Sequence, residues 1–393
     1  MINTIKGKLI SGLTCMIFLQ FSCPSPAGSR NGQAIEFDRH VLTTDFIAEG
    51  VAVADVNGDG KPDILSGAFW FEAPDWKKHE LSEPKVHVYN KGYSEFFLGF
   101  SQDVNRDGRP DLIRIGWPGQ PAHWLENPGN NSNRWKEYQI HPAVGNESPA
   151  FIDIDGDGRE DLLGNDPSAK KVIWIKSPAA GSATWTPYTI SANPDLATHM
   201  YTHGIGYGDI NGDGRKDVVI KSGWWEGPED PKTENWTFHP ANLGNDCAQM
   251  YVLDLNQDGR NDVISSSAHQ YGIWWHEQVQ QADGSIQFKQ HRIDSSFSQS
   301  HALMLADING DGHPDLITGK RYYAHNGGDP GAEDPAELNW YAYHPGKTPT
   351  WTKHSIDTNS GSGLNIVVQD MDKDGRPDIV VANKKGLFYF KQK

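Results

Sequence analysis

The sequence has few cysteines and a deficit of positive charge, and each shortage excludes a class of protein. Only three of the 393 residues are cysteines, and two of these precede residue 24, so disulfides cannot provide the framework of the fold. The 35 Lys and Arg are outnumbered by 51 Asp and Glu, which gives a formal charge of −16. Such a chain is poorly suited to neutralise nucleic-acid phosphates or to bind an anionic membrane surface. We therefore expect neither of these partners.

Long apolar runs are absent except near the N-terminus. Lys6 and Lys8 precede an apolar stretch at 9–21 that is too short for a membrane span, and the small residues after it are typical of an export signal. Either Cys23 carries the lipid of a bacterial lipoprotein, or an ordinary signal peptide is cleaved near Ala27. Both interpretations predict an exported protein that is periplasmic, extracellular or at the cell surface, with membrane attachment only through a lipid on Cys23.

A helix-forming composition is also missing. The chain has 41 Gly, 24 Pro and 11% aromatic residues, with a mean hydropathy of −0.62. These values favour short strands joined by tight turns over a helical bundle. The length alone permits two or three ordinary domains or one large all-β ring.

The sequence does contain a nine-residue motif that occurs seven times, at intervals of 45 to 63 residues. Each copy has oxygen-bearing side chains at positions 1, 3, 5 and 9 and a glycine at position 6, where the chain must reverse with positive φ. Alternate oxygen ligands around a sharp turn suit Ca²⁺. The Glu at position 12 and the flanking helices of an EF-hand are missing, so we expect strand–loop–strand calcium sites that stabilise the fold and take no part in catalysis.

Up to seven structural calcium ions are expected, and their charge would bring the formal −16 to about −2. The expected ligands are Asp55, Asn57, Asp59, Asp63, Asp103, Asn105, Asp107, Asp111, Asp153, Asp155, Asp157, Asp161, Asp209, Asn211, Asp213, Asp217, Asp254, Asn256, Asp258, Asp262, Asp307, Asn309, Asp311, Asp315, Asp370, Asp372, Asp374 and Asp378.

Each calcium motif lies within a unit of four predicted strands. A strand of small and apolar residues precedes the loop, and a β-branched strand, an aromatic strand and a Trp-x-x-His/Tyr strand follow it. The seventh unit lacks its fourth strand, and residues 36–42 carry that pattern at the other end of the chain. Pairing them with the last three strands closes a ring without free edges. The sequence therefore predicts an all-β seven-bladed β-propeller at 36–393, after a leader at 1–23 and a short linker at 24–35.

Residues that recur in register are interpreted as structural. The histidines at the repeated fourth-strand position are His40, His79, His291 and His354. Thirteen of the 14 tryptophans also fall in or beside the repeated strands, where packing between blades is expected. Trp117 breaks the register, and we interpret it either as a sugar-stacking platform or as a packed loop residue.

The first strand of a propeller blade lines the axis, so the residues six positions before each calcium loop should share one level near a mouth of the channel. These residues are Glu49, Phe97, Glu147, His203, Ala248, His301 and Leu364. Two imidazoles and two carboxylates at one level suit a divalent metal such as Zn²⁺ or Mg²⁺, or an acid and a base beside a bound substrate. The alternative is a set of polar residues at a wet channel mouth with no shared ligand.

The loops between the second and third strands should open on the same mouth. The basic residues in these loops are Lys221, His269, Lys320, Arg321, Lys384 and Lys385. An insertion at 322–337 is long enough to fold over the entrance. Together with the histidines, these cations predict a pocket that binds an anion or stabilises an enolate.

The seven loops, from DVNGDGKPD at Asp55 to DMDKDGRPD at Asp370, resemble the FG-GAP/VCBS repeats of integrin-like and bacterial secreted propellers over residues 36–393. The segments SSAHQYGIWWHEQ, FSQSHALMLADINGDG, TGKRYYAHNGGDPG and VVANKKGLFYF are similar to a group of bacterial exported proteins and to the propeller domain of aldos-2-ulose dehydratase. This resemblance implies a metal-assisted site at the propeller mouth that eliminates water from a keto-sugar. The residues in the matching segments are His269, His301, Lys320 and Arg321.

From these residues and this resemblance we expect a carbohydrate lyase or dehydratase that acts on keto-sugars or glycosides by β-elimination. The expected roles are metal ligation by His203, His301 and Glu147, proton removal by His269 or Glu49, and enolate stabilisation by Lys320 or Arg321. Two other functions fit the same mouth. One is a non-catalytic module that binds a glycan or a protein, and the other is a polysaccharide lyase.

Overall fold

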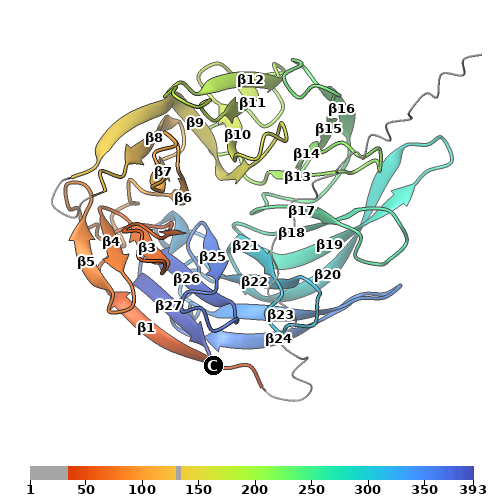
Figure 1. Cartoon of the computed structure of the whole chain (residues 1–393). Coiled ribbons are helices and arrows are strands. Elements are labelled where there is room, and N and C mark those ends of the chain that lie inside the picture. The colour runs from red at the N-terminus through yellow and green to blue at the C-terminus, as the bar shows by residue number, and fades with distance from the viewer. Residues whose placement is uncertain (1–33, 130–133) are drawn as a thin grey trace, which may run out of the picture.

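The computed structural model describes residues 34–129 and 134–393 of the chain. That part of the chain contains 27 β-strands and one short 3-10 helix, η1 (Ala324–Gly327). The strands form antiparallel sheets that follow one another around a ring (Figure 1). The fold is therefore all-β, as the composition predicted. The predicted leader and most of the linker, Cys23 included, lie outside the described residues. No helix of the described residues is long and apolar enough to cross a membrane.

Five sheets in the described part of the chain have four strands each. In four of them the strands lie in chain order: β2 (Ala52–Ala54), β3 (Asp63–Ser66), β4 (Phe69–Glu72) and β5 (Lys77–Glu80); β13 (Gly206–Gly208), β14 (Asp217–Ile220), β15 (Gly223–Glu226) and β16 (Thr237–Pro240); β17 (Tyr251–Leu253), β18 (Asp262–Ser266), β19 (Tyr271–Gln280) and β20 (Ile286–Ser298); and β21 (Ser300–Ala306), β22 (Asp315–Lys320), β23 (Leu338–His344) and β24 (Thr350–Asp357).

A further sheet has seven strands, because the long strand β9 (Lys136–Ile152) runs through two groups of four. The first half of β9 pairs with β8 (Gln120–Glu126), and its second half pairs with β10 (Asp161–Asp166). The outer members are β6 (Leu98–Gln102) and β7 (Asp111–Ile115) on one side, and β11 (Lys171–Lys176) and β12 (Thr186–Ser191) on the other.

Strand β1 (Phe37–Thr43) closes the ring. It pairs antiparallel with β27 (Gly386–Gln392), next to β26 (Asp378–Asn383) and β25 (Ile366–Gln369). His40 of β1 lies opposite Tyr389 of β27, and the first and last labelled strands lie side by side in Figure 1. The sequence predicted this pairing of the N-terminal strand with the last three strands, and the structure confirms it.

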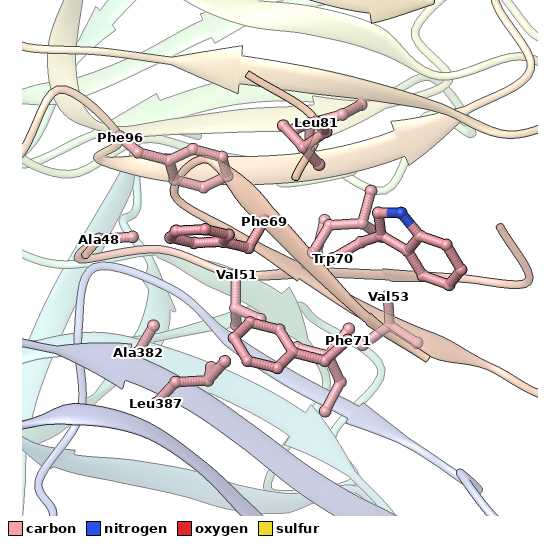
Figure 2. Packing of buried hydrophobic residues seen from close by; sticks show 14 of the residues in the cluster. Ala48, Val51, Val53, Phe69, Trp70, Phe71, Leu81, Phe96, Ala382 and Leu387 are labelled. Carbon is pink, nitrogen blue, oxygen red and sulfur yellow. The ribbon is translucent and has the colours of Figure 1, made fainter. Parts of the chain in front are cut away.

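Aromatic side chains fill the space between neighbouring sheets. Phe69 and Phe71 of β4 lie on one face of their strand, and Trp70 lies on the other (Figure 2). Phe96, which precedes the next sheet, and Leu387 of the last sheet belong to the same buried cluster. Apolar surface is thus buried between each sheet and its neighbours, and this burial is the main favourable term that holds such a ring together.

The repeated fourth-strand residues stack on the aromatic residue of the third strand. His79 lies 4.2 Å from Trp70 between ring centroids, with the ring planes 12° apart. The equivalent stacked pairs are His40–Tyr389, Tyr138–Trp124, Tyr188–Trp174, His239–Trp224, His291–Trp275 and His354–Trp340. The four histidines that the sequence assigned to the framework are all in this set, which confirms their structural interpretation.

The ninth residue of every repeated motif is a buried aspartate that accepts backbone hydrogen bonds. The carboxylate of Asp63 accepts one from Val56 N at 2.9 Å and one from Ala73 N at 2.8 Å, and burial raises the pKa of Asp63 to about 6. The equivalent residues are Asp111, Asp161, Asp217, Asp262, Asp315 and Asp378. Each ties its loop to the end of the third strand of the same sheet.

We expect His79→Ala to lower the free energy of unfolding by about 1 to 2 kcal/mol, because it removes both the stack on Trp70 and the 2.7 Å contact with Glu72. His79→Tyr should restore most of the loss, since Tyr138 stacks on Trp124 and bonds Glu126 in the same way. Guanidinium unfolding monitored by tryptophan fluorescence measures both. Equal stability of wild type and His79→Ala would contradict a structural role.

Candidate functional site

Four of the residues that the sequence placed at one level meet in the structure, together with Arg321 as a fifth. The four are Glu49, Glu147, His203 and His301. The Glu147 Oε2 atom lies 3.4 Å from His203 Nε2, 3.4 Å from His301 Nε2 and 3.4 Å from Arg321 Nη1. On its other side the guanidinium of Arg321 donates from Nη2 to Glu49 Oε1 at 2.9 Å. All five side chains are buried. We call these five residues the central cluster.

Backbone hydrogen bonds between neighbouring segments hold the central cluster in place. Glu147 lies in β9 and donates its N–H to Thr202 O at 2.8 Å. His301 lies in β21, and Arg321 directly follows β22 and donates its N–H to Gln299 O at 2.9 Å. Glu49 lies in the loop before β2 and accepts from Leu364 N at 2.8 Å. The bonds of Glu147 and Glu49 join segments that adjoin different sheets, whereas the bond of Arg321 extends the β21–β22 pair. The ring therefore sets the positions of these side chains.

The remaining residues of the predicted level do not join the cluster as ligands. Phe97, Ala248 and Leu364 are apolar and buried. Phe97 packs beside the guanidinium of Arg321, whose carbon lies 5.8 Å from the ring centroid. The predicted level therefore contains four polar residues, which belong to the central cluster, and three apolar residues, which do not.

The two histidines present free nitrogen atoms to Glu147. His203 Nδ1 lies 2.8 Å from the carbonyl oxygen of Tyr201, which can only accept, so Nδ1 carries a proton and Nε2 is the nitrogen that faces Glu147. Neither His203 Nε2 nor either ring nitrogen of His301 has a hydrogen-bond partner among the described residues. Buried polar atoms without a partner are rare. Their presence here points to a ligand that the side chains are arranged to hold.

The protonation states favour a metal. Burial, with Arg321 beside it, lowers the pKa of His301 to about 3, so this imidazole is neutral. In a tetrahedral zinc site with bonds of about 2.0 to 2.1 Å, neighbouring ligand atoms are about 3.3 Å apart. The 3.4 Å separations of Glu147 from His203 and His301 fit that geometry.

Of the two neighbouring cations Lys320 and Arg321, the structure brings only Arg321 into the central cluster. Successive residues of a strand point to opposite sides, and Lys320 is the last residue of β22. Its Nζ donates instead to Ser298 Oγ at 3.0 Å, and the side chain is buried. The expectation that Lys320 shares the central pocket is therefore corrected.

His269 lies at the edge of the central cluster, next to the insertion. Its ring centroid is 4.4 Å from that of His203, and its Nδ1 lies 3.3 Å from Asp329 Oδ2. His325, in η1, approaches the same oxygen with Nδ1 at 2.9 Å. The insertion predicted at 322–337 thus lies over this mouth, where the His325 N–H donates to the Tyr93 hydroxyl at 2.8 Å.

Two residues of the site had no clear signal in the sequence. Tyr93 lies between two cations, with the Arg321 guanidinium carbon 5.2 Å and Lys384 Nζ 4.1 Å from its ring centroid. Lys384 also donates to Tyr323 O at 3.1 Å, and burial lowers its pKa to about 8. The sequence placed Lys384 among the loop lysines at this mouth but contained nothing that distinguished it from Lys385. Tyr93 follows no repeat.

Trp117 is half-buried among aromatic neighbours at the same mouth. Its ring centroid lies 4.9 Å from that of Tyr93 and 5.8 Å from that of Tyr201, whose side chain is 41% exposed. A cavity of ≈ 500 Å³ adjoins this group and is lined by residues that include Tyr201, His203 and Lys221. An open space therefore reaches one of the two histidines of the central cluster.

We expect Arg321→Met to lower the free energy of unfolding by about 3 to 5 kcal/mol, because it leaves the Glu49 and Glu147 carboxylates buried without their cation. Arg134 is a matched control, since it also contacts two glutamates but is exposed. Arg134→Met should leave the free energy of unfolding nearly unchanged, because exposed ion pairs contribute little. Denaturant unfolding in calcium-containing buffer measures both variants. Similar losses in the two would show that burial adds nothing to the Arg321 interactions.

Comparisons with known proteins agree with the repeat structure. The family described as FG-GAP-like repeat matches residues 103–164 and 254–318, and the FG-GAP repeat family matches residues 48–69. No curated protein matches the sequence. Among solved structures, a lectin of Agrocybe aegerita, described by its specific recognition of non-reducing terminal N-acetylglucosamine, is similar with a TM-score of 0.44 and 16% identity, over 83% of this chain and 81% of the lectin. The chain therefore contains FG-GAP repeats within its ring of antiparallel sheets.

Proposed function

We propose that the chain is a seven-bladed β-propeller with a calcium ion in each of its seven loops. Counting β9 twice, the described strands form seven groups of four. In each loop the residue at position 1 folds the turn, as where Gly60 N donates to Asp55 Oδ2 at 2.8 Å. In two loops three carboxylates bring ligand atoms within 4.8 Å of one another: Asp153, Asp155 and Asp161, and Asp370, Asp372 and Asp374. A cation in each loop would relieve this repulsion.

We further propose that the central cluster binds a divalent transition metal and that the chain is a carbohydrate lyase or dehydratase. The observation that carries this proposal is the set of unpartnered nitrogen atoms of His203 and His301, 3.4 Å from the buried carboxylate of Glu147. Neutral imidazoles and one carboxylate are a donor set that Zn²⁺ accepts in catalytic sites. Such a metal acts as a Lewis acid toward the oxygen of a bound ketone.

The side chains around the cluster suit β-elimination from a keto-sugar or glycoside. Glu49 takes the proton from the carbon next to the ketone, and the electron pair of that C–H bond forms the enolate. Arg321, which donates to Glu49 Oε1, orients this base and stabilises the negative charge on oxygen. The enolate then collapses to an unsaturated ketone as the C–O bond at the β-carbon breaks. The departing oxygen takes a proton from a group such as Lys384, whose pKa is lowered to about 8.

His269 is the second candidate for the base, because its ring adjoins that of His203. Its Nδ1 is directed at Asp329 Oδ2, 3.3 Å away, whereas Glu49 Oε2 has only the long contacts with Ser94 N and Oγ, at 3.3 and 3.4 Å. Glu49 is therefore the better placed of the two. Comparing Glu49→Gln with His269→Asn assigns the role.

A non-catalytic glycan-binding module is the second candidate function. The aromatic group formed by Tyr93, Trp117 and Tyr201 favours it, since aromatic faces at the rim of a cavity are typical of small-molecule sites. This function requires binding without turnover and no metal beyond calcium. A polysaccharide lyase would use the same residues on a longer substrate.

Calcium removal tests the proposed architecture. We expect chelation with EGTA to lower the Tm by more than about 5 °C, because ligands that bind only the folded chain stabilise it by mass action. Calcium added back in excess should restore the Tm. Differential scanning calorimetry measures both values, and an unchanged Tm would refute the calcium sites.

The central cluster is tested by the double variant His203→Ala/His301→Ala. We expect it to lose the transition metal, measured by elemental analysis, and to lose at least about 100-fold in the formation of an unsaturated ketone from keto-glycosides, followed by ultraviolet absorbance. His291→Ala, which removes a histidine of the Trp stack, is the control for the loss of histidine alone. Full turnover in the double variant would refute the lyase, while glycan binding without turnover in the wild type would favour the binding module.

A further inference from the structure

A second group of metal-ligating side chains lies beside the central cluster, where the insertion meets His269. Ligand atoms of His269, His325 and Asp329 all lie within 4.8 Å of one another. These three residues share no atom with Glu147, His203 and His301, which form a separate group. We propose that His269, His325 and Asp329 bind a second divalent metal of the zinc class, which fastens the insertion over the mouth of the ring.

The geometry favours one shared ion. Asp329 presents Oδ2 to both imidazoles, at 3.3 Å from His269 Nδ1 and 2.9 Å from His325 Nδ1, and its Oδ1 lies 3.0 Å from His325 Nδ1. The two rings lie side by side, with centroids 4.5 Å apart and planes 33° apart. Two imidazole nitrogens and one carboxylate converging from one side leave a fourth position for water, which is the arrangement of three-ligand zinc sites.

The three side chains differ in how far solvent reaches them. The side chain of Asp329 is 13% exposed and that of His269 is 18% exposed, whereas that of His325 is 42% exposed. An ion can therefore enter from the solvent side, past His325, without unfolding the ring.

The ligands come from two segments, which also meet where the Tyr271 hydroxyl donates to Asp334 Oδ2 at 3.2 Å. His269 lies in the loop between β18 and β19, and His325 and Asp329 lie in the insertion. Tyr323, His325 and Asn326 all have positive φ, at 53°, 48° and 53°. This backbone conformation is costly for residues other than glycine, and a bound ion would offset that cost.

A metal here would control access to the central cluster. The same insertion contacts Tyr93 through His325 N and Lys384 through Tyr323 O, and Tyr93 packs on Arg321. His269 in turn contacts His203 ring to ring. With the second site filled, the insertion is fastened to the β18–β19 loop and the central cluster stays buried. With it empty, the insertion is free to move away from Tyr93.

The test is zinc stoichiometry in the full chain, purified, saturated with calcium and titrated with zinc chloride, with bound zinc measured by elemental analysis. We expect the wild type to bind two zinc ions, and His325→Ala and Asp329→Asn each to bind one. His344→Ala, which removes an exposed histidine elsewhere on the ring, should still bind two. Limited proteolysis of the insertion should become slower with zinc in the wild type, but not in His325→Ala.

The outcomes separate this proposal from the one for the central cluster. If His325→Ala and Asp329→Asn bind as much zinc as the wild type and are protected equally from proteolysis, the three residues are only hydrogen-bonded to one another and the second site is refuted. If His203→Ala/His301→Ala keeps the zinc that these two variants lose, the two sites are independent. If that double variant binds as much zinc as the wild type while His325→Ala loses one ion, the central metal is refuted and the second site stands.

Discussion

Closure of the ring is the constraint on which the rest of the structure depends. On the outside β1 pairs with β27 and completes the last sheet, and on the inside Leu364 N donates to Glu49 O, which joins the last sheet to the segment before the first. The last sheet thus gains its fourth strand from the N-terminal segment instead of ending at β27. Closure also holds Glu49 across from Glu147, His203 and His301, which come from other sheets far away in the sequence.

The central cluster is an arrangement of charge among buried side chains. Arg321 contacts both Glu49 and Glu147, and burial and Arg321 keep His301 neutral. In a low-dielectric site such interactions are stronger than in solution, and a charge without a partner is correspondingly costly. The free nitrogen atoms of His203 and His301 are therefore meaningful, because Glu147, the carboxylate that they face, is also paired with Arg321.

The repeats made the sequence unusually informative, since each position can be compared with six others. His79 and its equivalents were recognised as framework because they recur at one position of the fourth strand, and they stack on the aromatic residue of the third strand. His203 and His301 were recognised as different because they do not recur, and they meet at the axis. Lys320 and Arg321 could not be separated in this way. They are adjacent, chemically alike and outside the repeat. The orientation of the side chains at the end of β22 decided that Arg321, and not Lys320, contacts the central cluster.

The sequence by itself determined the all-β class, the unit of four strands, the closing strand and the level at which polar residues gather. These follow from alternation, turn chemistry and glycine positions within short windows of the chain, where local sterics decide the conformation. Only the tertiary structure decided that Arg321 bridges the carboxylates of Glu49 and Glu147. It also decided that Lys384 lies over the ring of Tyr93, and that the insertion brings His325 and Asp329 next to His269. Such contacts depend on the path of long loops and on distances across the ring, which no local pattern encodes.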